Sequence, residues 1–574
     1  MKNLKSLCIL ICIACISLTT AQTKNELAII IEVYETQRDY EFNPFESVKN
    51  TNEYYKLEAD FASEMIQKIN AISLENLSES DKISRELLLF VLQDKIDEFK
   101  FKMHLNPITN EVAFHLNLGN MGSKVLKTKD DVTTYLNDLE KLNRKIDYNI
   151  NLLRAGVAAG ISQPKAVFSN YSFTYDKHIV LDVTKSEFYK PFLNLPASLS
   201  NQEKEDFIKK VTKSIQENVV EKFKEIKAFF EDEYFPNTRE ELGVNNTPNG
   251  EAFYQNRINF YTTSQEYTAE DIHQIGLKEV ARIKAEMQKI INELQFEGTF
   301  ADFLQFLRTE EQFYPKTAKE LLMFARDIAK RIDAELPKYF KTLPRKPYGV
   351  VPVPAAIAPN YTGGRYSGSR SDETAGFYWV NTYNLPSRTL YTIPALTAHE
   401  AVPGHHLQIS LNNELPKDKI PKFRRNLYLS AYGEGWGLYA ETLADEMGIY
   451  TTPYEKFGKF TYEMWRACRL VVDTGIHAKG WSRQQVIDYL AENTALSIHE
   501  VTTETDRYIS WPGQAISYKI GEIKIRELRK KAENELKEKF NIRDFHEVIL
   551  GVGTVTLSIM ENRVNNYINQ KLNE

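Results

Sequence analysis

The sequence predicts a mainly α-helical fold with one small β-sheet, and two observations support this prediction. Most of the 574 residues lie in long segments whose apolar side chains recur every three or four positions, which is the spacing of one helix face. Only residues 343–390 depart from this pattern, because they are rich in Pro and Gly and then in β-branched and aromatic residues. We therefore expect one large helical body, either undivided or in two lobes.

The expected helices are distributed along the whole chain, without a repeat of fixed period. The helix predicted over residues 268–294 has a Thr-Ala-Glu-Asp start, in which the threonine oxygen caps the first turn. The same apolar spacing predicts the other helices, over residues 80–100, 127–155, 202–232, 317–336 and 522–540.

A β-strand is predicted at Gly376–Tyr383, a run of mostly β-branched and aromatic residues. The Pro-rich residues 343–359 and the Gly-, Ser- and Arg-rich residues 361–370 precede it. We therefore expect a small sheet just before His399.

Residues 1–21 have the layout of a secretory signal peptide. Lys2 and Lys5 precede an apolar run over residues 7–18, and Ala21 ends the segment of small residues where cleavage is expected. The apolar run is too short to span a bilayer. We therefore expect residues 22–574 to form a single exported catalytic domain, periplasmic or secreted. Lipidation at Cys15 ranks lower, because Cys12 occupies the position where a leucine is usual.

Composition excludes several classes of partner and site. The net charge is −6 and no basic stripe stands out, so we expect no nucleic-acid partner. After residue 21 no apolar stretch approaches the ~20 residues of a transmembrane helix. Three of the four cysteines lie in the leader, which leaves Cys468 without an internal partner, so a metal site would use nitrogen and oxygen ligands. The oligomeric state stays open.

The stretch His-Glu-Ala-Val-Pro-Gly-His-His, which begins at His399, predicts a zinc site. In the familiar H-E-x-x-H pattern, one helix presents two imidazoles on one face, and the glutamate serves as general base. Here the second histidine comes later. Pro403 and Gly404 must break or bulge the helix, and a two-residue bulge would bring His405 to the place of the second ligand. His406 is the alternative.

A third ligand is expected on a second helix. Glu434 begins the run Glu-Gly-Trp-Gly-Leu-Tyr-Ala-Glu, and a carboxylate among apolar neighbours needs a partner such as a metal. Glu441 lies two turns further along the same face and could orient a ligand or be the ligand itself.

These motifs, together with Gly376-Phe-Tyr-Trp-Val-Asn-Thr and the run from Asp506 through Ser-Trp-Pro-Gly-Gln-Ala-Ile-Ser-Tyr-Lys-Ile-Gly, resemble the bacterial family known as domain of unknown function 885. The resemblance covers nearly the whole mature chain. It implies a helical gluzincin-like fold with a deep cleft, similar to the angiotensin-converting-enzyme and thimet-oligopeptidase group, in which a glutamate on a following helix completes the zinc site.

The resemblance also implies a tyrosine that stabilises the oxyanion, and Tyr518 is the candidate. His477 is a second candidate donor. Arg507 would hold a substrate carboxylate or form a structural ion pair. Tyr378 and Asn381 would bind substrate backbone by strand addition.

We therefore expect His399, His405 and Glu434 to hold one Zn²⁺ per chain, with Glu400 as the general base for hydrolysis of short peptides. Two alternatives stay open. One is a zinc-dependent amidase or esterase acting on a non-peptide substrate. The other is a non-catalytic binding protein that contains a metal.

Overall fold

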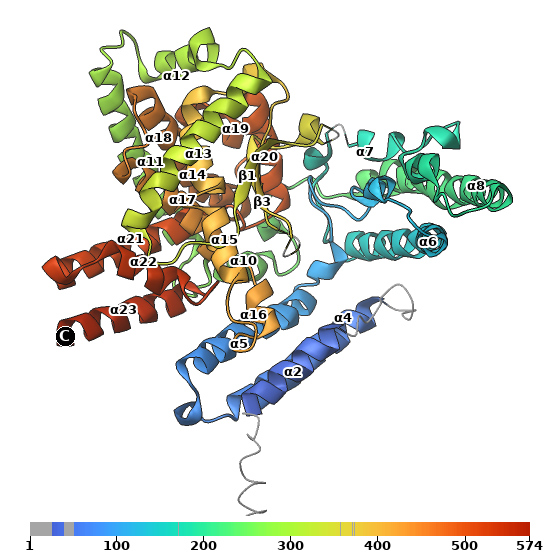
Figure 1. Ribbon diagram of the computed structural model, residues 1–574, viewed down its shortest axis with the longest axis horizontal. Helices are drawn as coiled ribbons and strands as arrows, with labels where there is room; N and C mark the ends of the chain where they lie inside the picture. Colours follow the sequence, from blue (N-terminus) through green and yellow to red (C-terminus); the bar gives the residue numbers. More distant parts are fainter. Residues whose placement is uncertain (1–25, 40–50, 170, 356, 370, 372) are drawn as a thin grey trace, which may run out of the picture. The chain divides into compact units, whose positions relative to one another are not determined.

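The computed structural model describes residues 26–39, 51–169, 171–355, 357–369, 371 and 373–574 (Figure 1). The expected leader at residues 1–21 and the lipidation alternative at Cys15 lie outside this range. In the described part of the chain, no helix combines the length and apolar character needed to cross a membrane. Cys468 is buried and unbridged.

The chain forms two compact units. The smaller contains the described residues up to Asp97 together with Lys417–Arg424. Its helices are α2 (Glu26–Asp39), α4 (Thr51–Asn70) and most of α5 (Glu79–Lys100). The Nη1 atom of the buried Arg424 donates to the Ser80 carbonyl and the Ser84 hydroxyl, both at 3.2 Å, and so joins the 417–424 segment to α5.

The larger unit contains the remaining residues and is built almost entirely of helices, so the predicted mainly α fold is confirmed. The predicted capped start at Thr268 is also present, since its side chain accepts from the Asp271 N–H. The longer helices are α6 (Lys129–Ala158), α8 (Asn201–Ile215), α10 (Gly250–Thr262), α11 (Ala269–Glu293), α12 (Phe300–Thr309), α13 (Ala318–Tyr339), α17 (Ser430–Glu446), α18 (Pro453–Lys479), α19 (Arg483–Asn493), α20 (Ile498–Ser510), α21 (Ser517–Leu536) and α23 (Leu557–Asn573).

Two predicted helices differ from the structure in detail. The one expected over residues 202–232 is continuous but contains two π-helical turns, Gln216–Val220 and Phe229–Tyr234. Phe230 and Tyr234, both in the second of these turns, are buried. Helix α21 begins earlier than expected, at Ser517.

Helix α18 lies at the centre of the larger unit. It is buried along most of its length and packs along α11, while α17 packs along α21. Apolar residues of α11 and α18, among them Ile283 and Val471, belong to one core.

The small sheet contains three strands in the order β1-β3-β2. β1 (Tyr348–Pro352) pairs parallel to β3 (Gly376–Val380), and β2 (Gly364–Ser367) pairs antiparallel to it. Val350, Tyr378 and Val380 pack with apolar residues of α13 and α14 (Ile393–Glu400), so the predicted sheet lies against the helix that carries His399.

Candidate metal centre

The helix that carries His399 ends where Pro403 and Gly404 indicated. α14 ends at Glu400, and α15 (His405–Asn413) begins after a four-residue connection. Within it, the Gly404 N–H donates to the Ala398 carbonyl at 2.9 Å. A Cβ at Gly404 would lie 1.9 Å from the His399 carbonyl oxygen, so only glycine fits there. The Trp436 Nε1–H of α17 donates to the Pro403 carbonyl at 2.8 Å.

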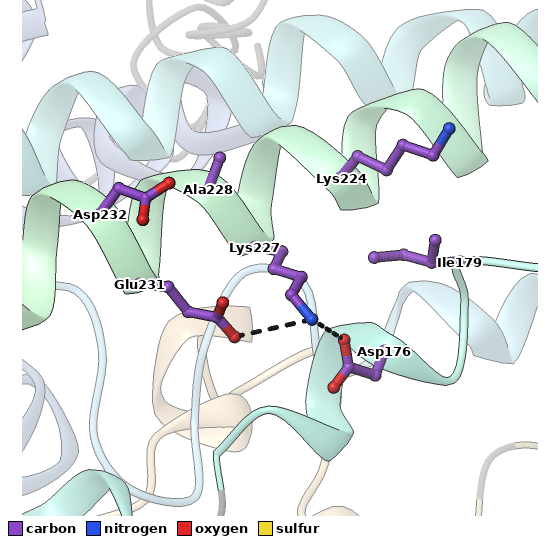
Figure 2. Close-up of a pocket in the computed structure, with 7 residues that line it drawn as sticks. All are labelled: Asp176, Ile179, Lys224, Lys227, Ala228, Glu231 and Asp232. Atoms are coloured by element: carbon purple, nitrogen blue, oxygen red, sulfur yellow. Dashed lines mark hydrogen bonds and ion pairs between the residues drawn. The ribbon is translucent and has the colours of Figure 1, made fainter.

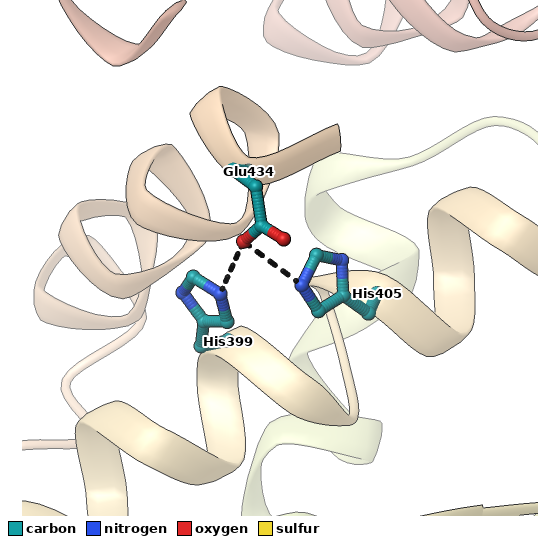
Figure 3. Close-up of side chains that lie close together, drawn as sticks. All are labelled: His399, His405 and Glu434. Atoms are coloured by element: carbon teal, nitrogen blue, oxygen red, sulfur yellow. Dashed lines mark hydrogen bonds and ion pairs between the residues drawn. The ribbon is translucent and has the colours of Figure 1, made fainter. Parts of the chain in front are cut away.

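This connection brings His405 beside His399 and opposite Glu434 (Figure 3). The Nε2 atoms of His399 and His405 each lie 3.4 Å from Oε2 of Glu434. One ligand atom from each residue falls within 4.8 Å of the others, and both histidines are buried. The three side chains come from α14, α15 and α17, so the group depends on the tertiary structure.

Glu441 orients one of these imidazoles rather than joining the group. Its Oε1 lies 2.8 Å from Nδ1 of His399. With the Nδ1 proton donated to this carboxylate, the Nε2 lone pair of His399 points toward Glu434. Gly437, between the two glutamates on α17, leaves room for the ring, since a Cβ there would lie 2.6 Å from its Cε1 atom.

The charges around the group favour a cation. Burial lowers the pKa of His399, but hydrogen bonds to Glu434 and Glu441 outweigh it and raise that pKa to about 10. Burial raises the pKa of Glu434, yet the His405 and His399 imidazoles hold it well below its ordinary value. Buried imidazoles and carboxylates therefore stabilise a positive charge between them, whether protons or a metal supply it.

The donor set suits zinc. Two histidines and one glutamate form a known catalytic zinc set, and ligand atoms about 2.0–2.2 Å from a tetrahedral zinc ion lie about 3.3–3.6 Å apart. The two 3.4 Å separations at Glu434 fall within this range.

Glu400, the expected general base, lies at the end of α14 next to this group. Its Oε2 accepts a hydrogen bond from the Tyr366 N–H of β2 at 2.7 Å. In the described part of the chain no hydrogen bond engages its Oε1, so one carboxylate oxygen is positioned and the other is open to a water.

His406, the alternative second ligand, points away from the group. Its Nδ1 lies 3.0 Å from the Tyr366 hydroxyl and 3.2 Å from the Ser410 hydroxyl. Burial lowers the pKa of His406 to about 4. The ring is therefore uncharged near neutral pH, and it is hydrogen-bonded to Tyr366 of β2.

Tyr518 and Arg507 interact electrostatically, and each also contacts other residues. Tyr518, in the first turn of α21, has the Arg469 guanidinium 4.4 Å from its ring centroid. Arg507 donates to Glu504 at 3.3 Å and to Gln514 at 2.7 Å, so it forms the structural ion pair that was one of its two expected roles.

The structure does not support His477 as an oxyanion donor. Its Nδ1 accepts from the Val244 N–H at 3.3 Å, and its Nε2 donates to the Tyr508 carbonyl at 2.8 Å. The ring is fully buried, and burial lowers its pKa to about 3. Both ring nitrogens of His477 are therefore engaged in hydrogen bonds with backbone groups.

Strand addition at Tyr378 and Asn381 is ruled out by the sheet order. β3 is the central strand and is paired on both sides. Both side chains are fully buried, and the Asn381 amide donates to the carbonyls of Ala358 and Tyr361 at 2.9 Å. Asn381 thus fixes a loop and does not face a substrate.

Sequence reasoning overlooked Tyr428 and undervalued Arg365. The Tyr428 hydroxyl donates to Oε1 of Glu434 at 2.8 Å, and so holds the carboxylate oxygen that the histidines do not face. Arg365 belongs to the Gly-, Ser- and Arg-rich residues 361–370, where solvated loop charges are the more common case, but it lies on β2 beside Tyr366. No sequence motif marks Tyr428 or Arg365 as a site residue.

A surface hollow elsewhere in the larger unit offers no comparable chemistry (Figure 2). Its Lys227 lies between Asp176 at 2.9 Å and Glu231 at 3.8 Å, so its charge is already paired. The hollow contains none of the expected site residues, and its lining is Asp176, Ile179, Lys224, Lys227, Ala228, Glu231 and Asp232.

Comparison with known proteins identifies the family to which this chain belongs. No curated protein matches the chain. A candidate lipoprotein from Colwellia psychrerythraea has a TM-score of 0.86 and 25% identity, over 95% of this chain and 100% of the other. A candidate lipoprotein of unknown function from Shewanella oneidensis has a TM-score of 0.68 and 18% identity, over 93% of this chain and 96% of the other. The model of the family described as bacterial protein of unknown function (DUF885) matches residues 48–564, so this chain belongs to that family.

Proposed function

We propose that this chain is an exported zinc-dependent hydrolase that cleaves peptide bonds of short peptides. One observation carries the proposal. His399, His405 and Glu434 place ligand atoms within 4.8 Å of one another, at separations that suit zinc, directly beside the Glu400 carboxylate. A structural site needs no base beside its ligands, so Glu400 favours catalysis over storage or binding.

His399, His405 and Glu434 would hold a zinc ion, which would supply Lewis-acid chemistry for the substrate carbonyl and the attacking water. Glu400, held by the Tyr366 N–H, accepts the water's proton at Oε1 and later delivers it to the leaving amine. Glu441 keeps His399 in the orientation that presents Nε2. Tyr518 donates its hydroxyl hydrogen to the oxyanion.

The choice of peptides rests on the motif resemblance to the gluzincin-like group, whose helical clefts admit short chains. Export rests on the N-terminal leader and on the two structural relatives described as candidate lipoproteins. Mass spectrometry of the exported chain distinguishes a first residue of Gln22, expected after Ala21 cleavage, from a lipidated Cys15.

Metal content and turnover together test the hydrolase. Elemental mass spectrometry should find about one zinc per chain in the wild type and in Glu400→Gln, and none in His399→Ala or Glu434→Ala. Against a pool of tripeptides with varied side chains, the wild type should show hydrolysis that Glu400→Gln lacks. Zinc without hydrolysis of peptides, amides or esters would favour a binding protein. No zinc, even when it is supplied at neutral pH, would overturn the mechanism.

A further inference from the structure

Tyr518 lies beside one guanidinium group and interacts electrostatically with two others. Arg469 lies 4.4 Å from the ring centroid, measured from its central carbon. Tyr518 also acts electrostatically on Arg507 and Arg365. Two of these arginines belong to α18 and α20, and the third belongs to β2, so three separate elements direct positive charge toward one side chain.

The two arginines from helices share a single carboxylate. Oε2 of Glu504 lies 3.1 Å from Arg469 Nη2 and 3.3 Å from Arg507 Nη1. The Nη1 atom of Arg469 and the Nε atom of Arg507 are buried, and neither has a hydrogen-bond partner in the described residues. One glutamate therefore does not satisfy both guanidinium groups, and buried donors remain for an incoming acceptor.

The Arg365 guanidinium lies over an aromatic ring, with its central carbon 5.9 Å from the centroid of Tyr361. The side chain of Arg365 is exposed, and no hydrogen bond or ion pair joins it to any residue that the structure describes. The next residue, Tyr366, donates its N–H to Glu400, which fixes this part of β2 beside the expected base. Besides Tyr361, the residues Glu400, Tyr518 and Glu434 act electrostatically on the Arg365 guanidinium. Arg365 thus interacts both with Glu434 of the candidate metal centre and with Tyr518.

Nearby acids offset this positive charge only in part. Burial raises the pKa of Glu111, and Arg507 opposes that shift without cancelling it. Burial, reinforced by Glu504, raises the pKa of Glu500 to about 7. Near neutral pH Glu500 therefore carries only part of its negative charge, which leaves the nearby arginines incompletely matched.

We propose that Arg365 and Arg507 bind the C-terminal carboxylate of the peptide substrate, which makes the enzyme remove residues from the C-terminal end. This inference rests on the proposed peptide hydrolysis and specifies the end of the peptide from which residues are removed. The terminal carboxylate is the one anion that every unmodified peptide carries, and guanidinium groups bind carboxylates through paired hydrogen bonds. Arg365 is the decisive residue, because within the described residues no carboxylate forms a hydrogen bond or ion pair with its guanidinium.

The experiment compares two tripeptide pools with the same varied sequences, one with free C-terminal carboxylates and one with C-terminal amides. Zinc-loaded wild type, Arg365→Gln, Arg365→Lys and Arg144→Gln are assayed for kcat/KM on both pools. Arg144 is an exposed arginine of α6 and serves as the matched control. Equilibrium dialysis of the same pools against Glu400→Gln and Glu400→Gln/Arg365→Gln measures binding without turnover.

The wild type should prefer free acids by about 10–100-fold, the effect expected of a hydrogen-bonded charge pair. Arg365→Gln should lose this preference, Arg365→Lys should keep part of it, and Arg144→Gln should keep all of it. Equal cleavage of both pools would overturn the carboxylate subsite and leave the peptidase proposal intact. An equal loss on acids and amides in Arg365→Gln would overturn it too, since Arg365 would then serve the transition state. Acid-selective binding without any hydrolysis would support the subsite and sink the peptidase proposal.

Discussion

Glu441 and His399 come from different helices, yet Oε1 of the glutamate lies 2.8 Å from Nδ1 of the imidazole. Both side chains are buried, and the Arg466 guanidinium lies 3.7 Å from the same carboxylate oxygen. The contact between Glu441 and His399 leaves Nε2 as the His399 nitrogen that faces Glu434 and would bind the metal in the proposed zinc site. In that proposal Glu441, which the sequence left as a possible ligand, instead orients His399.

Replacing Glu441 should therefore weaken metal binding without removing a ligand. We expect Glu441→Ala to lower zinc affinity by about 10–100-fold, the usual cost of losing a carboxylate that orients a metal-bound histidine. Glu441→Gln, which can still accept the Nδ1 proton, should lose less. Competition with a fluorescent chelator measures both. Glu446→Ala, which removes a surface partner of Arg529 from the same helix, is the control. Unchanged affinity in Glu441→Ala would contradict the orienting role.

Gly437→Ala should displace His399. The added methyl carbon would lie 2.6–2.8 Å from ring atoms of that histidine, closer than side chains tolerate. We expect helical circular dichroism to be retained and zinc affinity to fall by about 10-fold or more, because the ligand atom moves. Gly368→Ala is the matched control, since its nearest new contacts are ordinary, at 3.8 and 3.9 Å. Wild-type affinity in Gly437→Ala would show that the ring is free to shift.

Tyr518→Phe should slow the chemical step while leaving zinc content unchanged. The phenyl ring keeps its place beside Arg469, but the hydroxyl donor to the oxyanion is lost, and such a loss costs about 10²–10³-fold in kcat. Steady-state kinetics on the best-cleaved peptide checks this, with the exposed Tyr383→Phe as control. A raised KM at unchanged kcat would instead assign Tyr518 to ground-state binding.

His477 should make folding sensitive to acid. Burial depresses the pKa of His477 to about 3 in the folded chain, whereas in the unfolded chain it has its ordinary value near 6.5. Its contribution to stability is therefore complete above pH 6.5 and is lost as the pH falls toward 3. Between pH 7 and pH 5, the stability advantage of wild type over His477→Asn should shrink by about 2 kcal/mol in urea unfolding. A constant difference would mean that the folded-state pKa is not depressed.

The sequence predicted the helical class, the small sheet and the break after Glu400, because each depends on local pattern or on the chemistry of proline and glycine. It could not choose between His405 and His406, since that choice depends on the backbone path of residues 401–404 and on the contact between Pro403 and Trp436. The roles of Arg365 and Tyr428 could not be predicted for a related reason. The pairing of β2 with β3 places Arg365, and the Tyr428 contact with Glu434 depends on how the chain enters α17, which sequence spacing does not specify.

The four-residue connection between α14 and α15 has a consequence for how the centre can change over evolution. When one helix carries both histidines, its pitch fixes the bite distance between them. Here His399 and His405 belong to separate helices, so a substitution within residues 401–404 could widen or narrow that distance without disturbing either helix. In the proposed zinc site, the choice of ion and the strength of its binding would then be adjustable at a connection that contains neither histidine.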